Sequence, residues 1–320
     1  MAYKIVLTDS QFLDTSIEEE ELAVIGAKLV KAKETSEEAL IEIARDCDGI
    51  IVEYAKITEK VIKNLERCKV ISVMGIGYDM VDIAAATEHG IQVANVPDYC
   101  LDEVADHAMA LSLACARGVV TYHKQVVSGA WGENLRGLFK LQGRNFCIFG
   151  FGNIARKVAV RAKAFGYKVL AYDPYCNDED FKKLDVIKVD SLVSLAEQAD
   201  VLSIHAPLTA STKGIINRDI FSHMKKTAIL VNTSRGPLIN QVDLIETLKN
   251  QGILAAGLDV FEREPIETNS ELLRLDNVIL SPHIAFYSAE AEEEMRRRVP
   301  REIVYAFLEG QPRAFVNKNG

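Results

Sequence analysis

Short runs of almost wholly apolar residues alternate with amphipathic stretches along the chain. In the first hundred residues, the apolar runs predict strands at Tyr3–Thr8, Gly49–Val52, Val70–Met74 and Ile91–Ala94. Helical spacing lies between them at Glu18–Val30, Ser36–Asp46, Thr58–Arg67 and Asp82–His89. Strands that are apolar throughout, rather than alternating, are typical of parallel strands buried on both faces. The pattern therefore predicts a doubly wound α/β unit.

A long helical stretch, Leu101–Ser128, precedes a second α/β series. Its strands are expected at Phe146–Phe149, Lys168–Tyr172, Val201–His205, Ala228–Asn232, Ala255–Val260 and Val278–Ser281. Helical segments fill the gaps, among them Ala155–Phe165 and Val242–Asn250, and a last helix is expected at Ala289–Leu308. The predicted fold class is α/β, with two doubly wound parallel-sheet domains joined by the two long helices.

Composition and charge narrow the class of protein. Of the 320 residues, 48% are hydrophobic and 26% are charged, as is typical of globular proteins. The net charge of −9 disfavours nucleic acid or an anionic membrane as a partner. The N-terminus has no signal-peptide pattern, and the apolar stretches are far shorter than the ~20 residues that span a bilayer. The six cysteines form no CxxC pair and no zinc spacing, so we expect reduced thiols, no metal and a cytoplasmic protein.

A glycine-rich turn follows the first strand of the second series. The segment Gly150–Ala155 reads GFGNIA, the G-x-G-x-x-G/A pattern in which Gly150 permits the turn and Gly152 lets the backbone approach a pyrophosphate. The following helix N-terminus would face the phosphates. The next strand ends in Asp173, whose carboxylate would accept hydrogen bonds from the ribose hydroxyls and repel a 2′-phosphate. No Arg adjoins Asp173, so the sequence predicts NAD rather than NADP.

Five separated motifs give the chain a family resemblance. They are Gly75–Asp79 (GIGYD), Asn95–Pro97 (NVP), Asn232–Pro237 (NTSRGP), Leu258–Pro265 (LDVFEREP) and Ser281–Ala285 (SPHIA). Over about residues 45–310 the chain resembles the D-isomer-specific 2-hydroxyacid dehydrogenases, most of all the branch with the C-terminal-binding proteins and their bacterial relatives. The resemblance implies a flavodoxin-like substrate domain, residues 1–100 plus 288–320, and a Rossmann NAD-binding domain, residues 101–287.

Three residues in these motifs suit the reduction of a 2-oxo acid. Arg235 has forked donors that can anchor the carboxylate and polarise the carbonyl group. His283 can supply the proton, since an imidazole titrates near neutral pH. Glu264 would hydrogen-bond His283, orient it and favour its protonated form. The resemblance implies these same roles, whereas His107 and the other histidines are interpreted as structural.

The resemblance also implies further ligand contacts. Those to the cofactor come from Gly150, Gly152, Asn153, Ile154, Asp173, Ala206, Pro207, Thr233, Ser234, Arg235, Asp259 and His283. The backbone N–H groups of Asn153 and Ile154 would donate hydrogen bonds to the pyrophosphate, and Asp259 would face the nicotinamide side. Those to the substrate come from Arg235, His283 and the backbone of Gly75, Ile76 and Gly77.

Some positions depart from common family usage and leave alternatives open. Asn153 stands where many members have Arg, and Met80 where Asn is usual. Val73 and Met74 stand where phosphate-handling members often place an Arg, which leaves 3-phosphoglycerate as an alternative substrate only. The second function class is an NAD(H)-sensing scaffold or corepressor-like protein, but the complete set of Arg, Glu and His favours the NAD-dependent enzyme.

The sequence also predicts a homodimer and a moving cleft. The stretch Leu101–Ser128 carries apolar residues on more than one side, and Trp131 follows it, so we expect the cofactor domains to pair. Residues 75–77 and the catalytic residues belong to different domains, so we expect closure over the substrate. The hinges would be Asp98–Asp102 and Phe286–Ala289.

Overall fold

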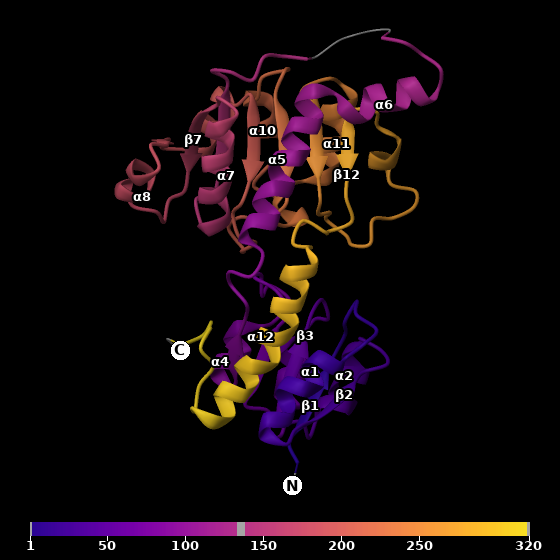
Figure 1. The fold of residues 1–320 in the computed structure, drawn as a ribbon, viewed down its shortest axis with the longest axis vertical. Helices are drawn as coiled ribbons and strands as arrows, with labels where there is room; N and C mark the ends of the chain where they lie inside the picture. The colour runs from indigo at the N-terminus through magenta and orange to yellow at the C-terminus, as the bar shows by residue number, and fades with distance from the viewer. Residues whose placement is uncertain (1, 133–137, 319–320) are drawn as a thin grey trace. The chain divides into compact units, whose positions relative to one another are not determined.

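The chain divides into two compact units in the computed structural model, which describes residues 2–132 and 138–318 (Figure 1). Unit 1 comprises Met1–Tyr99 with Ser288–Gly320, and unit 2 comprises Cys100–Tyr287. These limits lie within one residue of the expected domain ranges. Residues 1, 133–137, 319 and 320, which those ranges include, lie outside the described residues. The substrate and cofactor roles given to the two domains stay predictions.

Unit 1 is built on a five-stranded parallel sheet in the order β2-β1-β3-β4-β5. Its strands are β1 (Lys4–Leu7), β2 (Lys28–Lys31), β3 (Gly49–Val52), β4 (Val70–Val73) and β5 (Gln92–Ala94). Strands β3 and β4 are buried at every position. The chain reverses its direction of winding between β1 and β3, which makes this pair the topological switch point of the sheet.

The helices of unit 1 correct one prediction. They are α1 (Ser16–Leu22), the short 3₁₀ turn η1 (Ala23–Ile25), α2 (Glu37–Ala44), α3 (Glu59–Lys63), α4 (Ile83–Glu88) and α12 (Ala289–Leu308). The single helix expected at Glu18–Val30 is wrong, because Gly26 takes a left-handed conformation with φ 65° after η1. The residues beyond it form β2, which pairs in parallel with β1.

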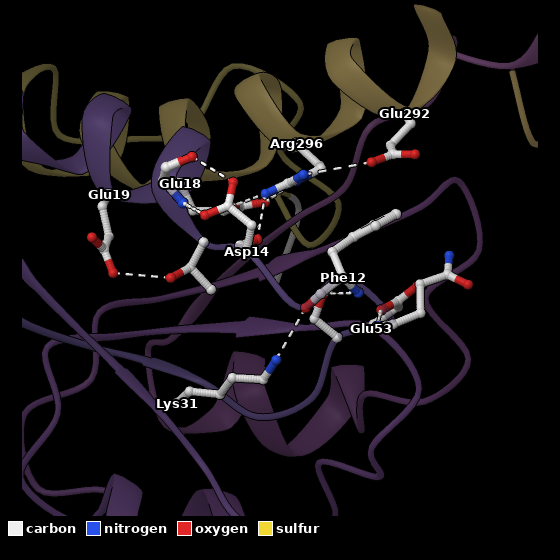
Figure 2. A network of polar contacts seen from close by, with 12 residues as sticks. Phe12, Asp14, Glu18, Glu19, Lys31, Glu53, Glu292 and Arg296 are labelled. Atoms are coloured by element: carbon white, nitrogen blue, oxygen red, sulfur yellow. Dashed lines mark hydrogen bonds and ion pairs between the residues drawn. The ribbon is translucent and has the colours of Figure 1, made fainter. Parts of the chain in front are cut away.

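A buried ion pair joins α12 to the N-terminal part of unit 1 (Figure 2). The Arg296 guanidinium donates to both carboxylate oxygens of Glu18, at 2.7 and 2.9 Å, and both side chains are buried. Arg296 also donates to the carbonyl of Asp14 at 2.6 Å and lies over the ring of Phe12. Because a bidentate pair holds the planar guanidinium in one geometry, it fixes α12 on α1.

Unit 2 is built on a seven-stranded parallel sheet in the order β12-β11-β10-β9-β6-β7-β8. Its strands are β6 (Asn145–Phe149), β7 (Lys168–Tyr172), β8 (Ile187–Lys188), β9 (Val201–Ile204), β10 (Ile229–Asn232), β11 (Ala255–Leu258) and β12 (Val278–Leu280). The first strand of the unit, β6, pairs with β7 on one side and β9 on the other. The switch point of this sheet therefore lies between β6 and β9.

Helices cover both faces of the larger sheet (Figure 1). The α-helices of unit 2 are α5 (Leu101–Arg117), α6 (Val119–Val127), α7 (Asn153–Ala164), α8 (Asp178–Lys183), α9 (Leu192–Gln198), α10 (Arg218–His223) and α11 (Gln241–Lys249), and its 3₁₀ turns are η2 (Gly236–Leu238) and η3 (Glu271–Arg274). Phe146 and Ile148 of β6 pack in the core with α5 and α7, whereas Cys147 and Phe149 pack in the core with α9, α10 and α11. Alternate residues of a strand thus fill opposite cores, which explains its apolar run.

The long stretch expected at Leu101–Ser128 is also not one helix. Gly118 has φ 61° and ends α5, after which α6 begins a new helix. Its left-handed backbone is one that residues with a Cβ rarely adopt. Among the described residues, no helix is long and apolar enough to cross a membrane. Two parallel α/β sheets confirm the predicted fold class.

Candidate active site

The glycine-rich turn lies at the switch point of unit 2. Gly150 follows β6 with φ 84°, and a Cβ on it would lie 2.6 Å from the backbone nitrogen of Ala206, which follows β9. Only glycine allows the two strand ends to approach this closely. Ligands of doubly wound sheets bind outside the carboxyl ends of the strands at such a point.

The N-terminus of α7 suits a phosphate. The helix begins after Gly152 with no side-chain cap and no acidic residue in its first turn. In contrast, α8, α9, α10 and α11 are each capped by a side chain of Asn or Ser. A Cβ built on Gly152 would meet none of the described residues within 4 Å, so open space lies above the first turn. Backbone N–H groups and the positive end of the helix dipole therefore face a space that an anionic group can enter.

Asp173 follows β7 beside this turn. Its carboxylate accepts hydrogen bonds from the backbone N–H of Phe151 at 2.7 Å and of Tyr175 at 2.8 Å. The side chain is thereby fixed next to the glycine-rich turn, where the sequence placed the ribose. The partly exposed carboxylate keeps lone pairs for further donors, since each oxygen accepts more than one hydrogen bond.

The loop after β10 carries Arg235 and is held in place by hydrogen bonds of its own side chains. The buried Asn232 side chain donates to the carbonyl of Arg235 at 2.9 Å and accepts the N–H of Ser234 at 3.0 Å. The Ser234 hydroxyl donates to the carbonyl of Ala206 at 2.6 Å, which joins this loop to the switch point. The Oγ1 of Thr233 is buried and has no hydrogen-bond partner among the described residues. An unpaired buried hydroxyl next to the turn fits a polar ligand such as a dinucleotide.

A close approach of backbones brings the Arg235 loop to the Glu264 loop. A Cβ on Gly236 would lie 1.9 Å from the backbone carbonyl of Phe261, so the backbones of the two loops are in contact at this glycine. The N–H of Phe261 in turn donates to Glu264 Oε1 at 2.8 Å. Neither Gly236 nor Phe261 was among the predicted site residues, because a contact between two backbone segments leaves no side-chain signal in the sequence.

His283 and Glu264 form the polar pair that the motifs predicted. His283 Nδ1 lies 2.7 Å from Glu264 Oε2, and both side chains are about one-third exposed or less. Burial alone would raise the pKa of Glu264, but the hydrogen bond and charge of His283, the N–H of Phe261 and the charge of Arg235 together lower it below its ordinary value. Glu264 is therefore ionised at neutral pH, and its carboxylate can accept a hydrogen bond from the His283 ring.

The loop Ser281–Ala285, here called the histidine loop, is wrapped around Asp259. The Asp259 carboxylate is wholly buried and accepts hydrogen bonds from Ser281 Oγ at 2.6 Å, from Ile284 N at 3.1 Å and from Ala285 N at 2.9 Å. Its backbone carbonyl accepts the N–H of His283 at 2.8 Å. Asp259 thus holds this loop, a role that the sequence did not predict, while its contact with the nicotinamide side stays a prediction.

The remaining predicted site residues come from other segments of the two units. Asn153 and Ile154 occupy the first turn of α7, and Pro207 follows Ala206. Gly75, Ile76 and Gly77 follow β4 in unit 1, where the Asn95 side chain donates to the carbonyl of Ile76 at 2.6 Å. The cofactor and catalytic candidates thus belong to unit 2, and the candidate substrate-binding residues 75–77 belong to unit 1.

Comparison with known proteins identifies the family. Residues 109–285 match the NAD binding domain of the D-isomer specific 2-hydroxyacid dehydrogenases. A hydroxypyruvate reductase of Thermotoga maritima is 40% identical over 299 residues, which are 92% of this chain and 93% of that protein. A D-3-phosphoglycerate dehydrogenase of Methanocaldococcus jannaschii is 40% identical over 84% of this chain, which spans only 51% of that protein.

A solved structure agrees over the whole chain. It is an NADPH-dependent glyoxylate/hydroxypyruvate reductase of Sinorhizobium meliloti in complex with NADP and malonate, with a TM-score of 0.88 and 29% identity, covering 99% of this chain and 97% of that one. Together these matches confirm the predicted family, the enzyme class and a nicotinamide cofactor. The uncapped start of α7, the space above Gly152 and the unpaired Thr233 hydroxyl fit that cofactor.

Proposed function

The chain belongs to the family of D-isomer specific 2-hydroxyacid dehydrogenases, and we propose that it interconverts a small 2-oxo acid and its D-2-hydroxy acid with NAD(H). The contact of 2.7 Å between His283 Nδ1 and Glu264 Oε2 carries the proposal. An ionised Glu264 at Nδ1 orients the His283 ring, so that Nε2 is the nitrogen that can exchange a proton with the substrate. Arg235 contributes its charge to the same site, where a carboxylate substrate needs a cation.

Each residue then has one task in the reaction. The nicotinamide cofactor supplies the hydride when bound. The first turn of α7 and the open space at Gly152 hold its pyrophosphate. Arg235 binds the substrate carboxylate and polarises the carbonyl group. Because Glu264 takes Nδ1 of His283, the proton that reaches the carbonyl oxygen leaves from Nε2.

The substrate we propose is a short, unphosphorylated 2-oxo acid such as glyoxylate or hydroxypyruvate. The names of the Thermotoga maritima and Sinorhizobium meliloti relatives support this class. In unit 1, Val73 and Met74 are apolar and buried, so neither position offers the cation that a phosphate would need. The backbone of residues 75–77 is the proposed binding element for the carboxylate. The intact set of Arg235, Glu264 and His283 favours an enzyme over a scaffold.

We also propose a preference for NADH over NADPH. The Asp173 carboxylate is held beside the glycine-rich turn by the N–H of Phe151. A fixed negative charge there attracts ribose hydroxyls and repels a 2′-phosphate. The kcat/KM for the two cofactors at equal substrate concentration tests the proposal. A higher value with NADPH would contradict it, and Asp173→Ala should narrow the difference.

A homodimer is the proposed assembly. Helix α6 has no buried residue, and it carries Val126 and Val127 at 54% and 74% exposure. Trp131, just beyond it, is 85% exposed. Apolar side chains exposed together on one segment are typical of a contact surface. Light scattering of dilute protein should give twice 35.4 kDa, and a monomer would end this proposal.

The reaction itself is tested by a panel of 2-oxo acids with NADH. We expect turnover on at least one short 2-oxo acid and none on 3-phosphohydroxypyruvate. With the best substrate, His283→Ala should lower kcat ~10²–10⁴-fold, the range for general acid catalysis. Arg235→Ala should also raise KM, because Arg235 meets the carboxylate before the reaction. His223→Ala, at a partly exposed position in the last turn of α10, is the matched control and should keep full activity. Turnover of the His283 variant near that of the wild type would contradict the mechanism.

A further inference from the structure

A second histidine contacts the histidine loop from α5. His107 Nε2 lies 2.8 Å from Ser281 Oγ and 3.5 Å from Asp259 Oδ1. Its side chain is 24% exposed, and the Asp259 side chain that it approaches is wholly buried. The three side chains therefore form a chain of polar contacts from α5 to the carboxylate around which the histidine loop is wrapped.

The hydrogen-bond directions in this chain are fixed by the serine. The Ser281 hydroxyl has one hydrogen, and it donates that hydrogen to Asp259 Oδ1 at 2.6 Å. Ser281 Oγ can therefore only accept in its contact with His107, so Nε2 of His107 carries a hydrogen. His107 thereby supports the one hydroxyl that anchors the start of the loop to the buried carboxylate. This arrangement holds whether or not the ring is also protonated on Nδ1.

The histidine loop needs such support because its backbone is strained. His283 has φ 55°, a left-handed conformation that persists in a residue with a Cβ only when its surroundings hold it there. The ring must at the same time meet Glu264, which lies on a different loop. A small shift of the 281–285 backbone would therefore separate His283 Nδ1 from its partner carboxylate. Misplacement of a reacting group by 1 Å can lower a rate ~100-fold.

We propose that His107 is a positioning residue for His283, and that it acts through Ser281 and Asp259. The proposal rests on the proposed function, in which His283 supplies the proton. It assigns a task to a histidine whose sequence position predicts only a structural side chain. Asp259, a buried acid, accepts its side-chain hydrogen bonds from the histidine loop, and through Ser281 the proposal links this carboxylate to α5.

Steady-state kinetics and hydrogen exchange test the proposal on the full chain. His107→Ala should lower kcat roughly 10- to 100-fold with little change in the Kd for NADH, and should speed exchange of the Ile284 and Ala285 amides. His107→Gln should restore most of the rate, because its terminal amide N–H reaches about as far as Nε2. His107→Asn is shorter and should not restore it. Met109→Ala, which opens a cavity on the same helix, is the control for lost stability and should leave kcat unchanged.

A double-mutant cycle with Ser281→Ala tests the route. If His107 acts through Ser281, the double variant should lose no more kcat than the worse single variant. Independent, multiplying losses would overturn the route, and a His107→Ala loss no larger than that of Met109→Ala would overturn the proposal. A fully active His283→Ala would instead refute the proposed function. The exchange rates of the loop amides would still report whether His107 holds the loop.

Discussion

The two units share a doubly wound topology and use their switch points in opposite ways. In unit 2, Gly150 meets Ala206 between β6 and β9, and Gly152 leaves open space beside them. In unit 1, the Asp9 carboxylate fills the corresponding place between β1 and β3. It accepts hydrogen bonds from the backbone N–H groups of residues 53–55 at 3.2, 2.7 and 3.1 Å.

The difference shows that topology supplies a crevice and that residue type decides its use. Glycine and an uncapped helix leave backbone donors available for an anionic ligand. An aspartate in the same place supplies that negative charge from the protein itself. Glu53 adds to this closure, since it is buried and accepts the N–H of Gln11 at 2.9 Å. In unit 1 the proposed ligand backbone, residues 75–77, accordingly follows β4 and not the switch point.

A substitution that separates the Arg235 loop from the Glu264 loop in unit 2 should have the largest effect on activity. Gly236→Ala would place a Cβ 1.9 Å from the Phe261 backbone, which must push the Arg235 and Glu264 loops apart. We expect kcat to fall about 100-fold, the loss that a 1 Å displacement produces. Gly252→Ala is the control, because the atom nearest to its Cβ is the end of the Thr247 side chain at 2.9 Å and the Thr247 backbone lies at 3.3 Å or more. An unchanged kcat in stopped-flow and steady-state assays would show that the loops are not coupled at Gly236.

Removing the Asp9 carboxylate, which fills the switch point of unit 1, should destabilise unit 1 without changing the affinity for the cofactor. Asp9→Ala leaves the N–H groups of residues 53–55 without their acceptor, which costs about 1–3 kcal/mol for a buried donor. Denaturant unfolding should therefore show a lower free energy of unfolding, with Asp9→Asn intermediate. Fluorescence titration should give an unchanged Kd for NADH. A weaker Kd for NADH would mean that this switch point also serves the cofactor.

Low pH should lower the stability of unit 2 through His205, which follows β9 at the switch point of that unit. Burial lowers the pKa of His205 to about 4 from an ordinary 6.5. The unfolded chain thus binds the proton first, so the contribution is complete above pH 6.5 and is lost as the pH falls toward 4. From pH 6.5 to 5 the loss should be about 2 kcal/mol. His205→Gln should flatten this limb of unfolding free energy against pH, and an equal slope in both proteins would refute the assignment.

The sequence predicted most of the fold because buried parallel strands leave continuous apolar runs. It failed where one glycine changes the element, at Gly26 before β2 and at Gly118 between α5 and α6. Both glycines lie in stretches whose apolar spacing continues the helical period on either side. Periodicity does not report φ, and a single glycine is tolerated inside many helices. The break therefore becomes visible only from the backbone.

The contact between the two proposed catalytic residues was predictable, and the contacts that support it were not. His283 and Glu264 lie in motifs with characteristic neighbours, and the structure places them 2.7 Å apart. His107 lies 174 positions before its partner Ser281. It ends the segment VPDYCLDEVADH, residues 96–107, which supports the family resemblance but points to no role for this histidine. A lone histidine on a helix has no sequence signal that separates a structural role from a positioning role. Only the contacts to Ser281 and Asp259 distinguish the two.

The smallest expected effect is the sharpest test of the open switch point. Gly152 has φ −77° and ψ −164°, a backbone that any residue adopts, and a Cβ on it would meet nothing within 4 Å. Gly152→Ala should therefore keep the melting temperature of the wild type. The added methyl would occupy the space above α7 where we place the pyrophosphate, so the Kd for NADH should rise about tenfold, or ~1.4 kcal/mol. Gly26→Ala, strained by φ 65° but in open space in unit 1, should instead lower the melting temperature and leave the Kd unchanged.

If Gly152→Ala bound NADH as tightly as the wild type, the pyrophosphate would not lie on this turn. The contrast between an open and a filled switch point would then have to be explained by something other than the cofactor.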